Sequence, residues 1–287
     1  MKKLVFPLAL FAFIACEKEI DFEIPDPGKK VVIETKIEAG EAIEMFLSES
    51  VYSLSAEDPS SRDDFEAFLY SDEPGSPFQF TVEPFSSWNE PRFVYRLNRN
   101  LAAGQNYRIV VRSNDLPEAS VDERIPSLVE IDQVQYDSIT KEFNITFKDN
   151  AATKDYYRIT VTELSPGEPS LIYSSIDLGL EFFGFSDFFG EDELDGRQYG
   201  AESFLPDVSF NGQNRSVKVR IEQPANVPFV QINLHHISES YYRHELTKNA
   251  YQSGGDLFSE PVQIFSNVNN GYGIMATSVK DSARVRF

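Results

Sequence analysis

The chain has 287 residues, of which 46 are acidic and 26 basic, for a net charge of −20. So negative a chain is disfavoured as a nucleic-acid binder, because phosphates need neutralisation by lysine and arginine. Electrostatic docking on anionic lipid is disfavoured for the same reason. A hydrophobic content of 41%, with 24 Phe and 13 Tyr, predicts folded cores rather than a disordered acidic tail.

The first residues have the pattern of an export signal. Two lysines precede a mostly apolar run over residues 4–15, which is too short for a transmembrane helix. The following pair, Ala15-Cys16, resembles the bacterial lipobox, although Phe13 stands where that motif prefers Leu. The resemblance implies cleavage between Ala15 and Cys16 and acylation of the Cys16 thiol, typically with palmitate. An ordinary secretory signal that meets a cysteine by chance is the alternative.

Residues 1–15 are therefore expected to be a signal peptide and residues 16–28 a lipidated tether. Without the signal peptide the chain has 24 basic and 46 acidic residues, a net charge of about −22, so acyl chains are its expected hold on a membrane. The charged run at residues 17–21 resembles the signal that sends Bacteroidota lipoproteins to the outer face of the outer membrane. We therefore expect an outer-membrane protein facing the cell exterior. An ordinary solvated tether is the alternative reading of this run.

Short β-branched and aromatic segments, separated by turn signals, begin at residue 29. The clearest are residues 31–37, 42–47, 65–70, 78–82, 93–97 and 107–111. Strands at this spacing predict an antiparallel β-sandwich over residues 29–126, immunoglobulin-like in arrangement. Cys16 is the only cysteine, so no disulfide is expected to support it.

A second β domain is predicted over residues 127–287. It opens with strands that resemble a fibronectin type III module, and residues 180–210 are expected to be an insertion. One helix is expected at about residues 238–252, with Ser238 as its N-cap. The predicted fold class is therefore mostly β, with two antiparallel β-sandwich-like domains and one helix in the C-terminal region.

The C-terminal third carries a set of recognisable motifs. They are Ser240-Tyr241-Tyr242-Arg243, Phe258-Ser259-Glu260-Pro261-Val262, Ser266-Asn267-Val268 and Gly271-Tyr272-Gly273-Ile274. Together with the lipobox and the segment at residues 30–34, they resemble the Bacteroidota lipoproteins catalogued as domain of unknown function 4249, over essentially the whole chain. The resemblance implies an outer-membrane lipoprotein often encoded beside a TonB-dependent transporter, and it brings no catalytic residues. His244 departs from it, because many relatives are aromatic there.

Asn269-Asn270-Gly271 is typical of a tight hairpin turn, since this turn needs positive φ. We expect it to join strands at residues 263–266 and 273–276.

Five phenylalanines close together are the best sequence candidate for a contact surface, because so many are rarely left in water without a purpose. Burial between the two domains is the alternative. The five are Phe182, Phe183, Phe185, Phe188 and Phe189.

One acidic segment has the ligand spacing of a calcium loop. Glu191, Glu193, Asp195 and Glu202 fall at positions 1, 3, 5 and 12, with Gly196 at position 6. Positions 1 and 3 are Glu where such a loop prefers Asp or Asn. Coincidence is the alternative in so acidic a chain.

A histidine metal site is not expected. His235 and His236 are adjacent on a predicted strand and point to opposite faces, so they cannot readily hold one ion together. One of them could act with His244, but nothing completes a zinc ligand set.

Two short segments resemble the O-glycosylation signal of exported Bacteroidota proteins. They are Asp137-Ser138-Ile139 and Asp281-Ser282-Ala283, which makes Ser138 and Ser282 candidate acceptors. Ordinary turns are the alternative.

No pattern for catalysis or nucleotide binding is present: the chain has no G-x-S-x-G elbow, P-loop or G-x-G-x-x-G fingerprint. We expect a non-enzymatic lipoprotein that binds a partner or ligand as an accessory to a TonB-dependent transporter, with no cofactor unless calcium binds. A surface adhesin or glycan-binding β-sandwich is the alternative, and a surface hydrolase is a third hypothesis.

Overall fold

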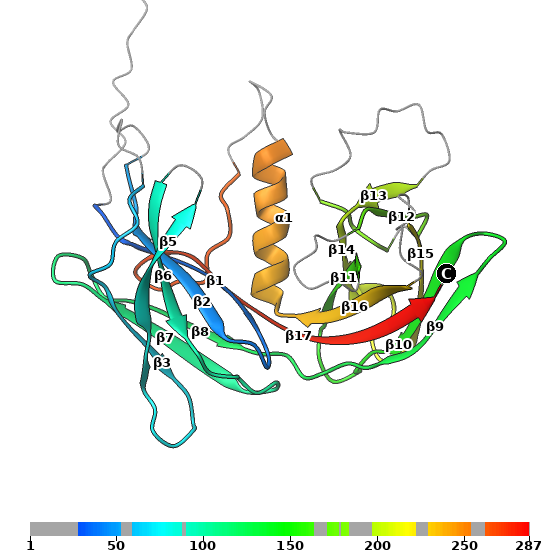
Figure 1. Cartoon of the computed structure of the whole chain (residues 1–287), viewed down its shortest axis with the longest axis horizontal. Coiled ribbons are helices and arrows are strands. Elements are labelled where there is room, and N and C mark those ends of the chain that lie inside the picture. The colour runs from blue at the N-terminus through cyan, green and yellow to red at the C-terminus, as the bar shows by residue number, and fades with distance from the viewer. Residues whose placement is uncertain are drawn as a thin grey trace, which may run out of the picture.

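A computed structural model describes residues 28–52, 59–87, 90–163, 171–177, 179–183, 197–221, 229–253 and 262–286. They form two β-sandwiches that share one long sheet, with an α-helix standing between them (Figure 1). Strands β1 to β8 are Val31–Glu38, Ile43–Glu49, Glu66–Tyr70, Phe78–Gln79, Thr81–Ser87, Glu90–Leu97, Asn106–Arg112 and Ala119–Arg124. Strands β9 to β17 are Ile131–Asp137, Glu142–Lys148, Tyr156–Glu163, Tyr173–Ser175, Gln198–Gly200, Glu202–Pro206, Asn214–Ile221, Phe229–Ile237 and Tyr272–Arg286. Helix α1 spans Glu239–Ser253, and the 3-10 turn η1 spans Asp207–Ser209.

The first sandwich packs β1, β2 and β6 against a four-stranded sheet in the order β4-β3-β7-β8, and β5 extends the first sheet beyond β6 as its edge strand. Its strands form because successive side chains point to opposite faces. In β1, Val31, Ile33 and Ile37 lie in the core, whereas Glu34 and Lys36 are exposed on the other face. Each such buried aliphatic side chain contributes about 1.5–3 kcal/mol.

The second sandwich packs β14, β11 and β16 against a five-stranded sheet in the order β13-β12-β15-β10-β9. In β16, Val230, Ile232 and Leu234 enter this core, and the residues between them face the opposite side of the sheet. The two cores are thus built from the same period-two pattern.

Strand β17 joins the two sandwiches. From Tyr272 to Ser278 it pairs in parallel with β1, and from Ser278 to Arg286 it pairs antiparallel with β16. Met275 belongs to the first core, and Val285 packs against the second. The eight-stranded sheet, in the order β14-β11-β16-β17-β1-β2-β6-β5, therefore runs without a break from one sandwich to the other.

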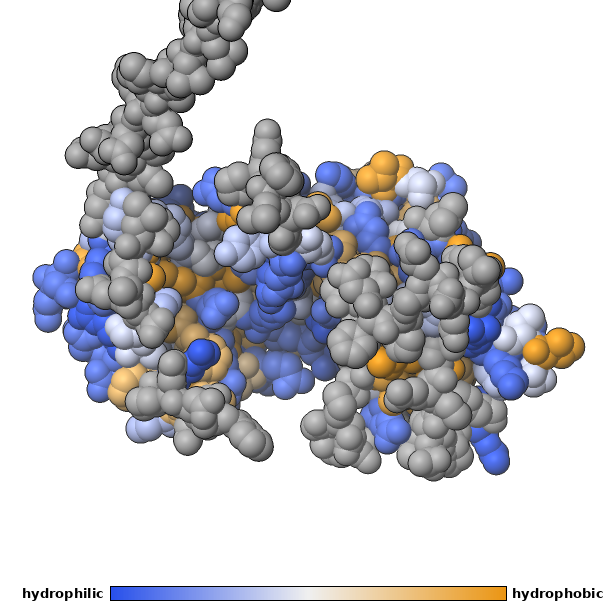
Figure 2. Space-filling model, turned by 90° about the horizontal axis from the view of Figure 1, so that it is seen from above, coloured by the Kyte–Doolittle hydropathy of each residue, from blue (hydrophilic) through white to orange (hydrophobic). Residues whose placement is uncertain are grey.

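Helix α1 rises from the shared sheet between the sandwiches (Figure 1), and hydrophilic side chains gather around it on that side (Figure 2). The Oγ of Ser238 accepts a hydrogen bond from the Tyr241 amide at 3.2 Å, which confirms Ser238 as the N-cap. A third apolar cluster seats the helix on the sheet. It consists of Tyr156, Phe204, Ile237, Tyr241, Ile274 and Ala276.

The predicted fold class is confirmed: the described residues are mostly β, sandwich-like, with one α-helix in the C-terminal region. Three details differ from expectation. First, β1 and β17 pair in parallel, not antiparallel. Second, residues 262–268 form no strand, so the expected hairpin is absent. Third, β14, which lies in the expected insertion, is part of the shared sheet. The division into units 29–126 and 127–287, and their likeness to immunoglobulin and fibronectin modules, stay predictions.

Candidate functional site

A polar network lies on the face of the shared sheet that carries α1. It joins four strands through Glu38 of β1, Thr160 of β11, Asn233 and His235 of β16, and Lys280 of β17. His235 Nδ1 is 3.2 Å from Glu38 Oε2, and its Nε2 is 3.2 Å from Thr160 Oγ1. Asn233 Nδ2 donates to Thr160 Oγ1 at 3.2 Å, and Lys280 forms an ion pair with Glu38. We call these five residues the sheet-face network.

The hydrogen bonds assign the proton of His235. Glu38 can only accept, so Nδ1 carries the proton, and Nε2 is free to accept from Thr160. Burial lowers the pKa of His235, against the opposing effect of Glu38, which favours this neutral form. Burial also opposes ionisation of Glu38, but hydrogen bonds from His235 and Lys280 outweigh it and lower the pKa of Glu38 to about 2.

The carboxylate of Glu38, the imidazole of His235 and the hydroxyl of Thr160 are hydrogen-bonded in the same order as the three groups of a hydrolytic triad. Thr160, however, is only 3% exposed, and β11 is paired on both sides, with β14 and β16. Its backbone amides are therefore committed to the sheet and cannot form an oxyanion hole around Thr160. The sheet-face network can hold a proton and tie strands together, but it offers no accessible nucleophile.

Next to this network, charged groups hold α1 on the sheet. Lys36 Nζ donates to Glu245 Oε1 at 2.8 Å and lies over the ring of Tyr241. The Tyr241 hydroxyl accepts from Arg158 at 2.9 Å, and Arg158 Nε is 2.6 Å from Glu202 Oε2. These contacts join β1, β11, β14 and α1, and they position the helix rather than form a cavity.

A second buried polar group lies at the end of the second sandwich. Oxygens of Asp149, Asp155 and Asp207 all lie within 4.8 Å of one another, and all three residues are buried. Such oxygens are calcium ligands, but here they accept hydrogen bonds from Tyr157, Thr153, Gly212 and the Asp155 amide. Burial, together with the charges of Asp149 and Asp155, raises the pKa of Asp207. These contacts give the cluster a structural role: they hold together the loops that follow β10 and β14.

The three histidines have different partners, and His235 and His236 point to opposite faces of the sheet, as the strand pattern predicted. His235 belongs to the sheet-face network, while His236 stacks on Tyr157 in the opposite direction and its Nδ1 is 2.7 Å from the Ser127 carbonyl. His244 on α1 has its Nδ1 2.9 Å from the carbonyl of Phe265.

Of the four expected calcium ligands, only Glu202 lies within the described residues; Glu191, Glu193 and Asp195 lie outside them. Glu202 is on β14, with one carboxylate oxygen already 2.6 Å from Arg158. Calcium binding by this segment stays a prediction.

Of the five candidate contact phenylalanines, two are described, and both are half-buried. Phe182 packs against Tyr173 of the second core, with ring centroids 5.4 Å apart. Phe183 stacks on Phe204 at 4.8 Å, beside α1. Phe185, Phe188 and Phe189 lie outside the described residues, so the contact-surface hypothesis now depends on them.

The two candidate glycosylation sites differ in setting. Ser138 is exposed in the turn between β9 and β10, where Asp137 accepts hydrogen bonds from the Ile139 and Thr140 amides. Ser282 is exposed within β17, and its hydroxyl donates to Asn233 at 2.7 Å. Modification of either residue stays a prediction.

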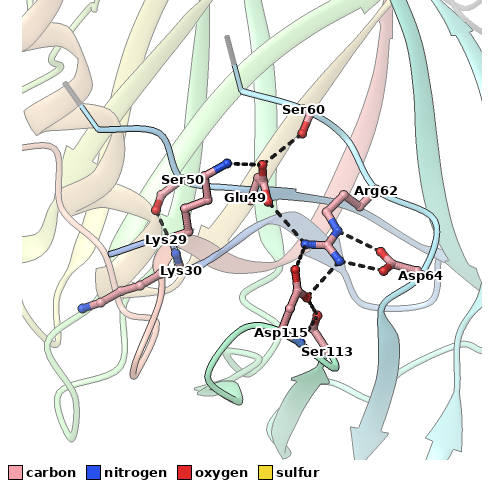
Figure 3. A network of polar contacts seen from close by, with 9 residues as sticks. All are labelled: Lys29, Lys30, Glu49, Ser50, Ser60, Arg62, Asp64, Ser113 and Asp115. Atoms are coloured by element: carbon pink, nitrogen blue, oxygen red, sulfur yellow. Dashed lines mark hydrogen bonds and ion pairs between the residues drawn. The ribbon is translucent and has the colours of Figure 1, made fainter. Parts of the chain in front are cut away.

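A charged network fixes the start of the described chain. Arg62 makes paired contacts with Asp64 at 2.6 and 2.8 Å and with Asp115 at 2.9 Å, and it reaches Glu49 at 3.3 Å (Figure 3). Glu49 in turn accepts from Lys29 Nζ at 2.9 Å. The residues that follow the expected tether are thereby held against β2, while Cys16 and Ala15 lie outside the described residues.

A family model described as "Domain of unknown function (DUF4249)" matches residues 17–284. The chain belongs to the DUF4249 family. No curated protein matches this DUF4249 chain.

The structure explains the Gly-Tyr-Gly segment of this DUF4249 protein. A Cβ on Gly271 would lie 2.5 Å from the Val31 carbonyl oxygen, and one on Gly273 would lie 2.0 Å from that of Ile33. Gly273 also has a φ of +103°. Only glycine allows β17 to approach β1 this closely.

The Ser-Asn segment also has a structural role. Asn267 donates to the Met275 carbonyl and accepts from the Met275 amide, both at 3.0 Å. Its side-chain amide thus replaces the partner strand that the predicted hairpin would have supplied. It also donates to Glu123 at 3.0 Å, which ties this segment to β8.

Sequence reasoning missed the sheet-face network and the buried carboxylates. Part of the sheet-face network could have been predicted from the sequence, because Gln231, Asn233 and His235 alternate with the apolar residues of β16. Their partners Glu38 and Lys280 come from distant strands, and no spacing relates Asp207 to Asp149. No helix of the described residues is long and apolar enough to cross a membrane.

Proposed function

We propose that this DUF4249 protein is an outer-membrane lipoprotein, anchored through acyl chains on Cys16 and facing the cell exterior. The observation that carries the proposal is the order of two lysines, a short apolar run and Ala15-Cys16 at the start of the chain. The net charge of about −22 after cleavage supports it, because such a chain needs lipid to stay on an anionic membrane.

The charged network around Arg62 supports a folded part that is connected to the lipid anchor by a tether. Gly28 is twelve positions after Cys16, and an extended chain of that length spans about 40 Å. The ion pair of Lys29 with Glu49 fixes the first residues after the tether to the first sandwich. The end of that sandwich with Lys29 and Arg62 would then lie within about 40 Å of the membrane.

The protein then acts by binding rather than by catalysis, as an accessory to a TonB-dependent transporter. One support is that the Glu38-His235-Thr160 series of the described residues has no accessible nucleophile. The other is the resemblance of the sequence motifs to outer-membrane lipoproteins that are often encoded beside such transporters. In this role the two sandwiches, held by one sheet, present fixed surfaces to the partner.

Acylation is tested by growing cells with an alkyne analogue of palmitate and measuring label on the purified protein. We expect label on the wild type and none on Cys16→Ala, which should be released from membranes as a folded protein. Protease added to intact cells should degrade the wild type. An unlabelled wild type, or a variant that stays in the membrane, would contradict the anchor.

Partner binding is tested by affinity purification from detergent-solubilised outer membranes, followed by mass spectrometry. We expect a TonB-dependent transporter to be enriched with the tagged wild type over an unrelated tagged lipoprotein. Equal recovery from both baits would contradict the accessory role and leave the anchor unaffected.

A further inference from the structure

A groove of about 530 Å³ lies on the outer face of the four-stranded sheet, where β3 ends, β7 begins and β8 ends. Volumes of this size are usual for sites that hold small ligands. The polar side chains that line it are contributed by all three strands and the turn after β3. They are Tyr70, Asp72, Asn106, Arg108, Asp122 and Arg124.

The register of the strands brings these side chains together. Tyr70 is paired with Arg108, which is paired with Asp122 on its other side, and Asn106 is paired with Arg124. Their sequence neighbours on the opposite face, including Leu69, Ile109 and Val121, are fully buried in the first core. The groove is therefore built on a rigid part of the molecule, which limits the entropy lost on binding.

The polar groups of the groove are not used up by contacts with one another. Arg108 and Asp122 are 3.9 Å apart and half-exposed, and Arg108 reaches Ser120 only at 3.4 Å. Among the residues that the structure describes, the side chains of Asp72, Asn106 and Arg124 have no hydrogen-bond partner. These donors and acceptors are available to a ligand.

The mixture of charges limits the kind of ligand. Two guanidinium groups oppose a cation, and the carboxylates of Asp72 and Asp122 oppose an anion. The lining offers no apolar pocket for the side chain of a peptide or for an acyl chain. A hydroxyl group both donates and accepts, so it can satisfy arginine, carboxylate and amide groups alike without carrying charge.

We propose that this groove binds a neutral oligosaccharide. Arg108, Asp122 and Asn106 bind sugar hydroxyls, and the ring of Tyr70 packs against the apolar face of a sugar. The inference deepens the proposed binding role by naming a ligand class, but it depends neither on the lipid anchor nor on a transporter.

The test uses the full mature protein in detergent, on an array of neutral oligosaccharides that includes α-glucans, β-glucans, mannans and xylans, with acidic glycans beside them. The best neutral glycan is then titrated by calorimetry. The variant Arg108→Gln with Asp122→Asn keeps the net charge and should weaken binding by about tenfold to a hundredfold. Tyr70→Ala tests the stacking separately.

The matched control is Arg96→Gln with Glu83→Gln, which removes a 2.8 Å exposed ion pair from the other sheet of the same sandwich. It should bind as the wild type does. Circular dichroism and thermal unfolding establish that each variant is folded. The proposal is overturned if the folded wild type binds no neutral glycan, if only acidic glycans bind, or if the groove variant binds as tightly as the control. None of these outcomes would affect the acylation or transporter tests.

Discussion

At the residue scale, the groups that face a position across the shared sheet restrict which residue can stand there. Gly273 is constrained twice, by its positive φ and by the carbonyl oxygen of Ile33. His235 is constrained by Glu38 on one ring nitrogen and Thr160 on the other. Both positions predict measurable consequences of substitution.

We expect Gly273→Ala to destabilise the protein by roughly 2–4 kcal/mol, because a Cβ adds backbone strain and collides with β1. Gly40→Ala is the matched control, since Gly40 has a φ of +85° but open space around its Cβ position, and it should cost only about 1 kcal/mol. Urea unfolding followed by circular dichroism measures both. Equal losses would mean that contact with β1 does not matter.

His235 makes stability depend on pH. Burial holds its folded pKa below the unfolded value of 6.5, so the unfolded chain binds more protons in the window below 6.5. Its contribution is fully present above that value and is lost as the pH falls toward the folded pKa. Glu38 on β1, Lys280 on β17 and Arg158 on β11 are the charged groups that face it.

We therefore expect the wild type to lose more stability than His235→Gln when the pH falls from about 7.5 to about 5.5. His244→Gln serves as the control, because it replaces a histidine outside the sheet-face network. Urea unfolding at both pH values gives the slopes. A wild-type slope equal to that of His235→Gln would refute a buried neutral His235.

At the element scale, β17 illustrates how a strand can begin without a hairpin partner. Residues 262–268 have no strand conformation, yet Met275 finds both its hydrogen bonds in the side chain of Asn267. The positive φ of Asn270 turns the chain into β17, as the turn signal indicated. A side chain, rather than a strand, therefore completes the ladder at this edge.

Replacing Asn267 tests this role. Asn267→Ala leaves the amide and carbonyl of Met275 without partners and should cost about 2–4 kcal/mol. Asn100→Ala, at an exposed asparagine, should change stability by less than about 0.5 kcal/mol. Chemical unfolding measures both, and a similar small effect for the two variants would show that water replaces Asn267 easily.

At the scale of the whole molecule, one strand makes two cores interdependent. Met275 and Val279 of β17 belong to the first core, whereas the same strand pairs with β16 of the second sandwich through Arg286. Neither sandwich can lose β17 without exposing an edge of the other. This coupling predicts a single cooperative unfolding transition.

We expect calorimetry to show one transition, with equal calorimetric and van't Hoff enthalpies. Met275→Ala should lower the stability of the whole transition by about 2–5 kcal/mol. Val208→Ala, at a side chain that is 78% exposed, should leave it unchanged. Two resolved transitions, with only one shifted by Met275→Ala, would show that the sandwiches unfold independently.

The candidate sites show where sequence reasoning ends. Asn106, Arg108 and Asp122 belong to strands whose existence follows from alternation, but the groove they line depends on register between β7 and β8 and on the nearness of β3. The Arg62 network likewise joins residues from four separate segments. Distances between residues of different strands depend on how those strands are placed in the fold. Local sequence patterns hold no information on that placement.

The sequence by itself determined the mostly β character, the α1 helix and its Ser238 cap, because these follow from local composition and periodicity, and it is also the source of the predicted export signal with Cys16. Only the tertiary structure decided that β17 pairs in parallel with β1, some 240 residues earlier, and so unites two sandwiches in one sheet. The physical reason is that a period-two pattern specifies which face of a strand is buried, whereas the choice of neighbouring strand depends on fit over the whole molecule. Gly271 and Gly273 make this pairing possible, because the absence of a side chain lets the backbones of β17 and β1 approach closely.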